Sequence, residues 1–171
     1  MLATEAAKST RRRSRLSDGR IDTTIQQERS CWCWAACVQV VMKSRGVRYS
    51  QRKLASRIPR LADACCRTPL PKSCDVGLTD QEITDLCRAV GLLAVERTGP
   101  LNEASLDAAL ADGRPVAVGF RWGHMCLVYG REKGKYLMYD PLGPASGALT
   151  RTDIMNYGQG YSTWQTSWTG L

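Results

Sequence analysis

The sequence predicts an α+β protein in which an N-terminal helical half packs on a C-terminal antiparallel β-sheet. Up to Gly113, apolar stretches with helix-type periodicity are bounded by helix start and stop signals. After Gly113 the pattern changes to short strand-like runs at 114–121, 124–131, 135–140 and 162–168. Helices first and strands last along one chain is the order of an α+β fold with two packed layers.

The first helix is expected at about 33–44, and Gly46 suits the residue that follows a helix end. Ser50 is a candidate N-cap for a second, short helix that would run through Ile58. Pro59 would end that helix, because proline lacks the backbone N–H that helix continuation needs.

A cysteine-bearing loop is expected at 62–77, followed by a helix with a capping box formed by Thr79 and Glu82. Gly91 would follow the end of this helix, and the run 92–95 is typical of a strand.

Asn102 is a candidate N-cap for a further helix that ends at Gly113. Gly130 and Gly134 lie between two strand-like runs and favour a hairpin there.

The length and composition of the chain limit the number of domains that it can form. At 171 residues with 43% hydrophobic and 23% charged content, a single globular domain is expected, and we assign it to 24–171. Residues 1–23 are polar and basic, which predicts a disordered segment; an export signal or a processed segment is the alternative. Without a long apolar run there, neither an ordinary signal peptide nor a membrane anchor is expected.

The net charge of +8 is spread along the chain apart from Arg11, Arg12, Arg13 and Arg15. No nucleic-acid-binding motif accompanies these residues, so the charge indicates a solvated surface and no nucleic-acid partner is expected.

Cys33 stands where the first helix is expected to begin. Free N–H groups and the positive end of the helix dipole favour a thiolate there, and a thiolate is a nucleophile for covalent catalysis. The alternative is a buried cysteine packed by tryptophans. Cys31 and Cys37 are rival nucleophiles, but Cys37 falls inside the helix and the residue six positions before Cys31 is Ile25.

The chain has one histidine, His124, so any Cys–His pair must use it. His124 lies in a strand-like run, and the next run ends at Asp140. A nucleophile on an early helix, a base on a later strand and a carboxylate after the next strand form a triad that only folding assembles.

These residues carry a resemblance to a known family. Gln27-x5-Cys33-Trp34-Ala35 resembles the active-site motif of papain-type cysteine proteases, and Tyr139-Asp140-Pro141 is similar to the acid segment of bacterial papain-like peptidases. Two such groups are the avirulence proteases of plant-associated bacteria and the double-glycine leader peptidases of bacteriocin exporters. The similarity covers about residues 24 to 169. It departs from papain itself in having aspartate, not asparagine, as third member.

The resemblance implies a papain-like fold with the active site in a cleft between the helical and sheet halves. It implies that Gln27 completes the oxyanion hole, and that Trp164 or Trp168 shields the His124–Asp140 pair, although ordinary sheet core suits these tryptophans equally well.

Eight cysteines are many for this length. The resemblance implies a Cys31–Cys74 disulfide and hence an oxidising compartment. Two alternatives stay open: fully reduced thiols, and zinc held by Cys65, Cys66, Cys74 and Cys87, in which adjacent ligands disfavour tetrahedral geometry. Cys37 and Cys126 are most simply buried thiols.

We therefore expect a cysteine endopeptidase that acts on protein or peptide substrates without cofactor or metal, as a monomer. Export by a non-classical or contact-dependent route, as a bacterial effector, is expected, with a cytoplasmic location as the alternative. A deamidase or an acyl transferase could use the same thioester chemistry, and a non-catalytic binding module is the third possibility.

Overall fold

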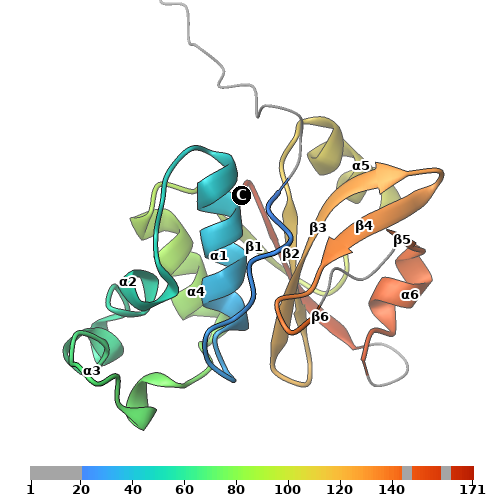
Figure 1. Ribbon diagram of the computed structural model, residues 1–171. Helices are drawn as coiled ribbons and strands as arrows, with labels where there is room; N and C mark the ends of the chain where they lie inside the picture. Colours follow the sequence, from blue (N-terminus) through green and yellow to red (C-terminus); the bar gives the residue numbers. More distant parts are fainter. Residues whose placement is uncertain (1–20, 144–147, 159–162) are drawn as a thin grey trace, which may run out of the picture.

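The computed structural model describes residues 21–143, 148–158 and 163–171. Two halves lie side by side, with helices on one side and a sheet with two further helices on the other (Figure 1). Residues 1–20 of the segment expected to be disordered lie outside the described ranges. None of the described helices is long and apolar enough to cross a membrane.

The helical half begins with α1 (Cys33–Ser44), which has the expected bounds. It continues with α2 (Gln51–Ala55), the 3₁₀ turn η1 (Pro59–Leu61), α3 (Ala62–Cys65), the 3₁₀ turn η2 (Lys72–Cys74) and α4 (Asp80–Ala89).

Local signals in the sequence explain most of these bounds. The Ser50 side chain accepts a hydrogen bond from the Lys53 N–H at the start of α2, and the capping box of Thr79 and Glu82 opens α4. The prediction that α2 reaches Ile58 was wrong. α2 ends at Ala55, and Pro59 is the first residue of η1. An N–H at that position would have no partner within the helix, so proline costs no hydrogen bond there.

The expected loop 62–77 is in fact partly helical, because α3 and η2 lie within it. The expected strand 92–95 was also misplaced. Gly91 has φ +87° and the Leu92 N–H donates to the Cys87 carbonyl at 2.9 Å. Residues 91 and 92 therefore form the C-terminal cap of α4 and do not begin a strand.

Among the described residues, the sheet has six antiparallel strands in the order β1-β6-β2-β3-β4-β5. They are β1 (Val95–Thr98), β2 (Val116–Phe120), β3 (His124–Glu132), β4 (Lys135–Tyr139), β5 (Ala148–Leu149) and β6 (Trp164–Thr169). Helix α5 (Glu103–Ala111), capped by Asn102 as expected, precedes β2, and α6 (Arg151–Met155) follows β5. Neither β5 nor α6 was expected from the sequence.

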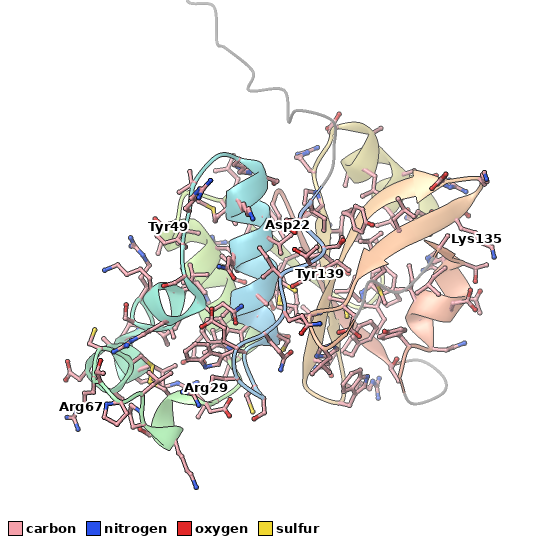
Figure 2. All side chains as sticks on the ribbon, in the orientation of Figure 1. Asp22, Arg29, Tyr49, Arg67, Lys135 and Tyr139 are labelled. Carbon is pink, nitrogen blue, oxygen red and sulfur yellow. A yellow bond between two sulfur atoms is a disulfide. The ribbon has the colours of Figure 1, made fainter. Side chains whose placement is uncertain are left out.

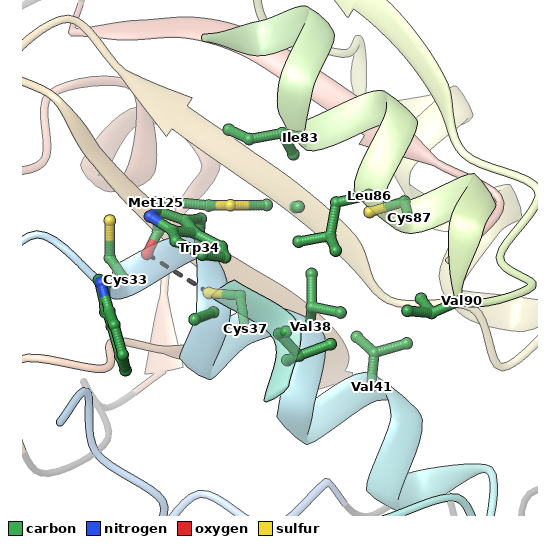
Figure 3. Close-up of a cluster of buried hydrophobic side chains, with 14 of the residues drawn as sticks. Cys33, Trp34, Cys37, Val38, Val41, Ile83, Leu86, Cys87, Val90 and Met125 are labelled. Atoms are coloured by element: carbon green, nitrogen blue, oxygen red, sulfur yellow. Dashed lines mark hydrogen bonds between the residues drawn. The ribbon is translucent and has the colours of Figure 1, made fainter. Parts of the chain in front are cut away.

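Alternate residues of the strands face two separate cores. On β2, Ala117 belongs to the core under α1 and α4, whereas Val116 and Val118 belong to the core under α5 and α6. Figure 3 shows the first core, where apolar side chains of α1 and α4 meet Met125 of β3. The sheet is therefore covered by helices on both faces.

A strap formed by residues 21–31 joins the two halves. It runs between α1 and the sheet (Figure 1), and the Tyr139 hydroxyl donates to the Ile25 carbonyl at 2.7 Å (Figure 2). On the other side, Gln51 donates through Nε2 to the Gln26 carbonyl at 2.8 Å and accepts from the Glu28 N–H at 2.8 Å. The strap thus holds Gln27 at the junction between helices and sheet.

Candidate active site

Cys33 is the first residue of α1, after Trp32 as N-cap residue. The first-turn N–H groups of a helix have no partner within it, so the positive end of the helix lies beside this sulfur. The Cys33 side chain is 6% exposed, and its Sγ lies 4.0 Å from the Gly123 carbonyl, in the turn before β3. Cys33 is therefore largely buried but still reachable from solvent.

Strand pairing brings His124 and Asp140 together. His124 begins β3 and Asp140 directly follows β4, and because these neighbours are antiparallel, the end of β4 lies beside the start of β3. His124 Nε2 is 2.8 Å from Asp140 Oδ1, with both side chains buried. This contact leaves the other ring nitrogen, Nδ1, available for Cys33, and the two residues line the same cavity.

The charges of this cluster favour a protonated imidazole. Burial opposes protonation of His124, but its interactions with Asp140 and then with Cys33 outweigh burial and raise its pKa to about 9. Burial likewise opposes ionisation of Asp140, yet donors from His124, the Leu142 N–H and Tyr157 keep the pKa of Asp140 below its usual value. An imidazolium flanked by a carboxylate and a cysteine sulfur is the resting arrangement of a cysteine nucleophile.

The aromatic ring that covers His124 is Trp122. The two ring centroids are 4.5 Å apart with an interplanar angle of 23°. The expectation of shielding by Trp164 or Trp168 was wrong, and the sheet-core alternative is correct, because Trp168 packs in the core under α1 and Trp164 in the opposite core.

Gln27 lies in the strap six residues before Cys33, and its amide is engaged in the resting structure. Nε2 donates to the Arg29 carbonyl at 2.8 Å and to the Ser30 carbonyl at 2.7 Å. Oε1 is buried without a hydrogen-bond partner among the described residues. To donate to a substrate oxyanion, the amide must give up at least one of these two bonds.

The two rival nucleophiles occupy unsuitable surroundings. Cys37 is fully buried, one turn into α1, and its Sγ contacts the Met125 carbonyl at 3.4 Å (Figure 3). Burial raises the pKa of the Cys37 thiol well above its ordinary value, so it stays protonated. Cys31 is exposed, and its backbone N–H donates to Asp75 Oδ1 at 2.8 Å, on the side of the helical half.

The disulfide joins Cys65 to Cys74, so the expected Cys31–Cys74 pairing was wrong. The indole N–H of Trp32 donates to the Cys74 carbonyl at 2.7 Å, whereas Cys31 is exposed and its backbone N–H is bonded to Asp75. Cys65 at the end of α3 has its Cα 5.5 Å from that of Cys74, within bonding reach. The disulfide contradicts the fully reduced alternative and removes two of the four sulfurs that zinc would need.

A cavity of about 120 Å³ opens beside Cys33 and His124. α1, α4 and the sheet line it, so it lies at the junction of the two halves, as a papain-like cleft does. Its walls are mainly apolar. Besides Cys33 and His124, the lining residues include Trp34, Leu78, Ile83, Met125, Trp168, Asp80, Gln165 and Thr166. Gln27 lines a separate surface pocket with Pro141 and Leu142.

His124, Cys126 and Asp140 place potential metal ligand atoms within 4.8 Å of one another. All three are buried, and the His124–Asp140 hydrogen bond occupies the space between two of these atoms. A metal would have to replace the proton of that bond, so the geometry suits proton transfer better than metal binding.

Comparison with known families agrees with this geometry. The profile of the family described as papain-like cysteine protease AvrRpt2 matches residues 16–161. The chain belongs to this family. It is a papain-like cysteine protease, as the sequence motifs predicted. A search of curated proteins found no match.

Solved structures confirm the papain-like α+β fold of this cysteine protease. One is a double-glycine-motif protease from an AMS/PCAT transporter in complex with its leader peptide (TM-score 0.55, 11% identity, covering 90% of this chain and 94% of that one). Another is the peptidase domain of Streptococcus ComA, a bifunctional ABC transporter of a quorum-sensing pathway (TM-score 0.56, 16% identity, covering 86% and 97%).

Two residues of the site were missed in the sequence of this protease. Trp122 lies in the turn between β2 and β3, two positions before His124, and strand periodicity does not point to it. Tyr157, whose hydroxyl donates to Asp140 Oδ2 at 2.7 Å, follows a helix that was not predicted, and no local pattern points to it.

Proposed function

We propose that the protein is an endopeptidase in which Cys33 is the nucleophile, His124 the general base and acid, and Asp140 the residue that orients His124. The observation that carries the proposal is the position of His124: its Nε2 lies 2.8 Å from Asp140 Oδ1, and it lines one cavity together with Cys33. Family membership supports proteolysis as the reaction class.

The proposed reaction begins with a thiolate–imidazolium pair of Cys33 and His124. The thiolate attacks the carbonyl carbon of the scissile bond, which forms a C–S bond and places negative charge on the oxygen. His124 then gives its proton to the departing amine, and the C–N bond breaks to leave a thioester. Water attacks the thioester with His124 as base, and Cys33 is released. Asp140 keeps the imidazole in the required tautomer throughout.

The oxyanion hole is proposed to consist of the Cys33 backbone N–H and the Gln27 side chain. The position of Gln27 in the strap between the two halves supports this role. Because its Nε2 contacts two backbone carbonyls in the resting protein, substrate binding must reorient the amide.

The proposed substrate is an extended segment of a protein or peptide that crosses the cavity beside Cys33. The transporter protease of similar fold binds a leader peptide in its solved complex, which supports a peptide ligand for this cleft. Proteolysis is favoured over deamidation or acyl transfer because the matching family consists of proteases.

The test is to incubate a diverse peptide library with the wild-type protein, with Cys33→Ala and with Cys31→Ser as matched control, and to analyse the products by mass spectrometry. We expect cleaved peptides from wild type and from C31S and none from C33A. Intact peptides carrying only deamidated glutamine, or cross-linked peptides, would replace the endopeptidase proposal by one of the two alternatives. Cleavage by C33A would contradict the assigned nucleophile.

We further propose that the protein acts as a monomeric effector outside the cell that makes it. The Cys65–Cys74 disulfide supports this location, because such bonds persist in oxidising compartments. Fractionation of producing cells tests the location, and retention in the cytosol would contradict action outside the cell. Size-exclusion chromatography tests the assembly, and elution as a dimer would contradict a monomer.

A further inference from the structure

We propose that Tyr157 is a positioning residue for the catalytic pair: its phenol fixes the Asp140 carboxylate in the rotation that presents Oδ1 to His124. This inference deepens the proposed function and rests on it. Tyr157 is not among the described residues that line the cavity beside Cys33, and its hydroxyl contacts Asp140, so it would act through Asp140.

Three donors hold the two oxygens of Asp140. Oδ1 accepts from His124 Nε2 and from the Leu142 N–H, both at 2.8 Å, and Oδ2 accepts from the Tyr157 hydroxyl at 2.7 Å. With partners on both oxygens, the carboxylate cannot rotate about its Cβ–Cγ bond without breaking a charge-assisted hydrogen bond. The Leu142 and Tyr157 donors therefore define the angle at which His124 meets Oδ1.

Tyr157 is itself held in place from several sides. It follows α6, whose start is closed by the capping box of Thr150 and Asp153, and its N–H donates to the Ile154 carbonyl at 3.2 Å. Its carbonyl accepts from Thr163 Oγ1 at 3.0 Å. The backbone of Tyr157 is thus tied both to the end of α6 and to the residue before β6.

The same residue also anchors the ring that covers His124. The Tyr157 carbonyl accepts from Trp122 Nε1 at 3.2 Å, and Phe120 packs between the two aromatic rings, 6.0 Å from Trp122 and 5.5 Å from Tyr157. The next residue, Gly158, has φ +84°, and a Cβ there would lie 2.7 Å from Trp122 Cζ2. Tyr157 therefore contacts both groups that constrain His124: the carboxylate through its phenol and the indole through its backbone.

Loss of the phenol should have two consequences. One oxygen of Asp140 would lose its protein donor, which frees the carboxylate to rotate away from His124. The ionised carboxylate would also lose a stabilising hydrogen bond, so protonation of Asp140 would begin at a higher pH. The titratable groups that face Asp140 are His124, Tyr157, Cys37, Cys126 and Tyr139.

The test compares Tyr157→Phe with Tyr136→Phe. Y157F removes only the hydroxyl and keeps the ring contact with Phe120. Tyr136 is the matched control, because it belongs to the core against which Tyr157 packs and its hydroxyl also donates to a carboxylate, Asp107 Oδ1, at 2.9 Å. For Y157F we expect kcat to fall about tenfold with KM within about twofold of wild type, the loss of one hydrogen bond to a charged group. For Y136F we expect kcat to be unchanged.

A second measurement is independent of turnover. His124 is the only histidine, so its imidazole gives a single set of signals in a ¹H–¹⁵N spectrum. The titration is made in the Cys33→Ala background, in which the thiol of the proposed nucleophile is absent. An acid-side inflection of the His124 signals then reports protonation of Asp140. We expect Y157F to move this inflection to higher pH and Y136F to leave it in place.

The outcomes are distinct. A lower kcat together with a moved inflection supports the positioning role. If neither kcat nor the inflection changes, the positioning role is overturned and the proposed protease function stands. The positioning role is also overturned if kcat and the melting temperature fall while the inflection does not move. If wild type cleaves no peptide, the proposed function fails, and the inflection alone still decides whether Tyr157 holds Asp140.

Discussion

Replacement of Asp140 by asparagine isolates the charge of the proposed triad from its geometry. The asparagine oxygen can keep the place of Oδ1, accepting from His124 and the Leu142 N–H, while its amide group donates to the Tyr157 oxygen. Every contact of the native carboxylate then has a counterpart. Asp140→Asn should therefore fold normally and differ mainly in having no negative charge beside the imidazole.

The magnitude follows from the protonation of His124. The rise of its pKa from 6.5 to about 9 corresponds to roughly 3 kcal/mol in favour of the imidazolium. Burial opposes this rise, and the hydrogen bond to Asp140 is the largest favourable contribution. Without the carboxylate charge, burial should bring the pKa of His124 to 6.5 or below. The thiolate–imidazolium pair then becomes scarce at pH 7, and we expect kcat/KM to fall about 100-fold.

The assay is kcat/KM against pH for a cleaved library peptide, combined with titration of the single imidazole by NMR. Asp107→Asn is the matched control, because Asp107 also accepts from a tyrosine hydroxyl but lies away from His124. The reasoning is refuted if D140N keeps kcat/KM within about threefold of wild type at pH 7. It is equally refuted if the pKa of His124 is unchanged in the folded variant.

Three further outcomes are expected. Gln27→Ala should lower kcat by ~100 to 1,000-fold yet leave measurable cleavage, because the backbone donor of the oxyanion hole remains; wild-type rates would exclude Gln27 from that role. The contribution of His124 to the free energy of unfolding should be fully present just below pH 6.5 and fall by up to roughly 3 kcal/mol as pH rises through about 9, because folding raises the pKa of His124. Chemical denaturation at several pH values across this range measures the free energy of unfolding, and a value that does not change with pH would contradict the prediction. Peptide mapping without reductant should recover Cys65 linked to Cys74; a Cys31–Cys74 peptide would contradict the structure.

Local sequence signals determined the elements that depend on neighbouring residues. The apolar run after Cys33 sets α1, and the capping box of Thr79 and Glu82 sets the start of α4, because such hydrogen bonds close within one turn. The expected strand 92–95 failed for the opposite reason. Its buried side chains complete the core beside α4, and pairing with β6 begins only at Val95.

The sequence alone determined the family, the helices-then-sheet order and the candidates Cys33, His124 and Asp140, because a single histidine and a motif of fixed spacing leave few choices. Only the tertiary structure decided which cysteine bonds Cys74 and which tryptophan covers His124. It also placed Tyr157 on the carboxylate of Asp140. These contacts join side chains from separate elements, and their partners follow from how α1, α6 and the sheet pack, which no local pattern records.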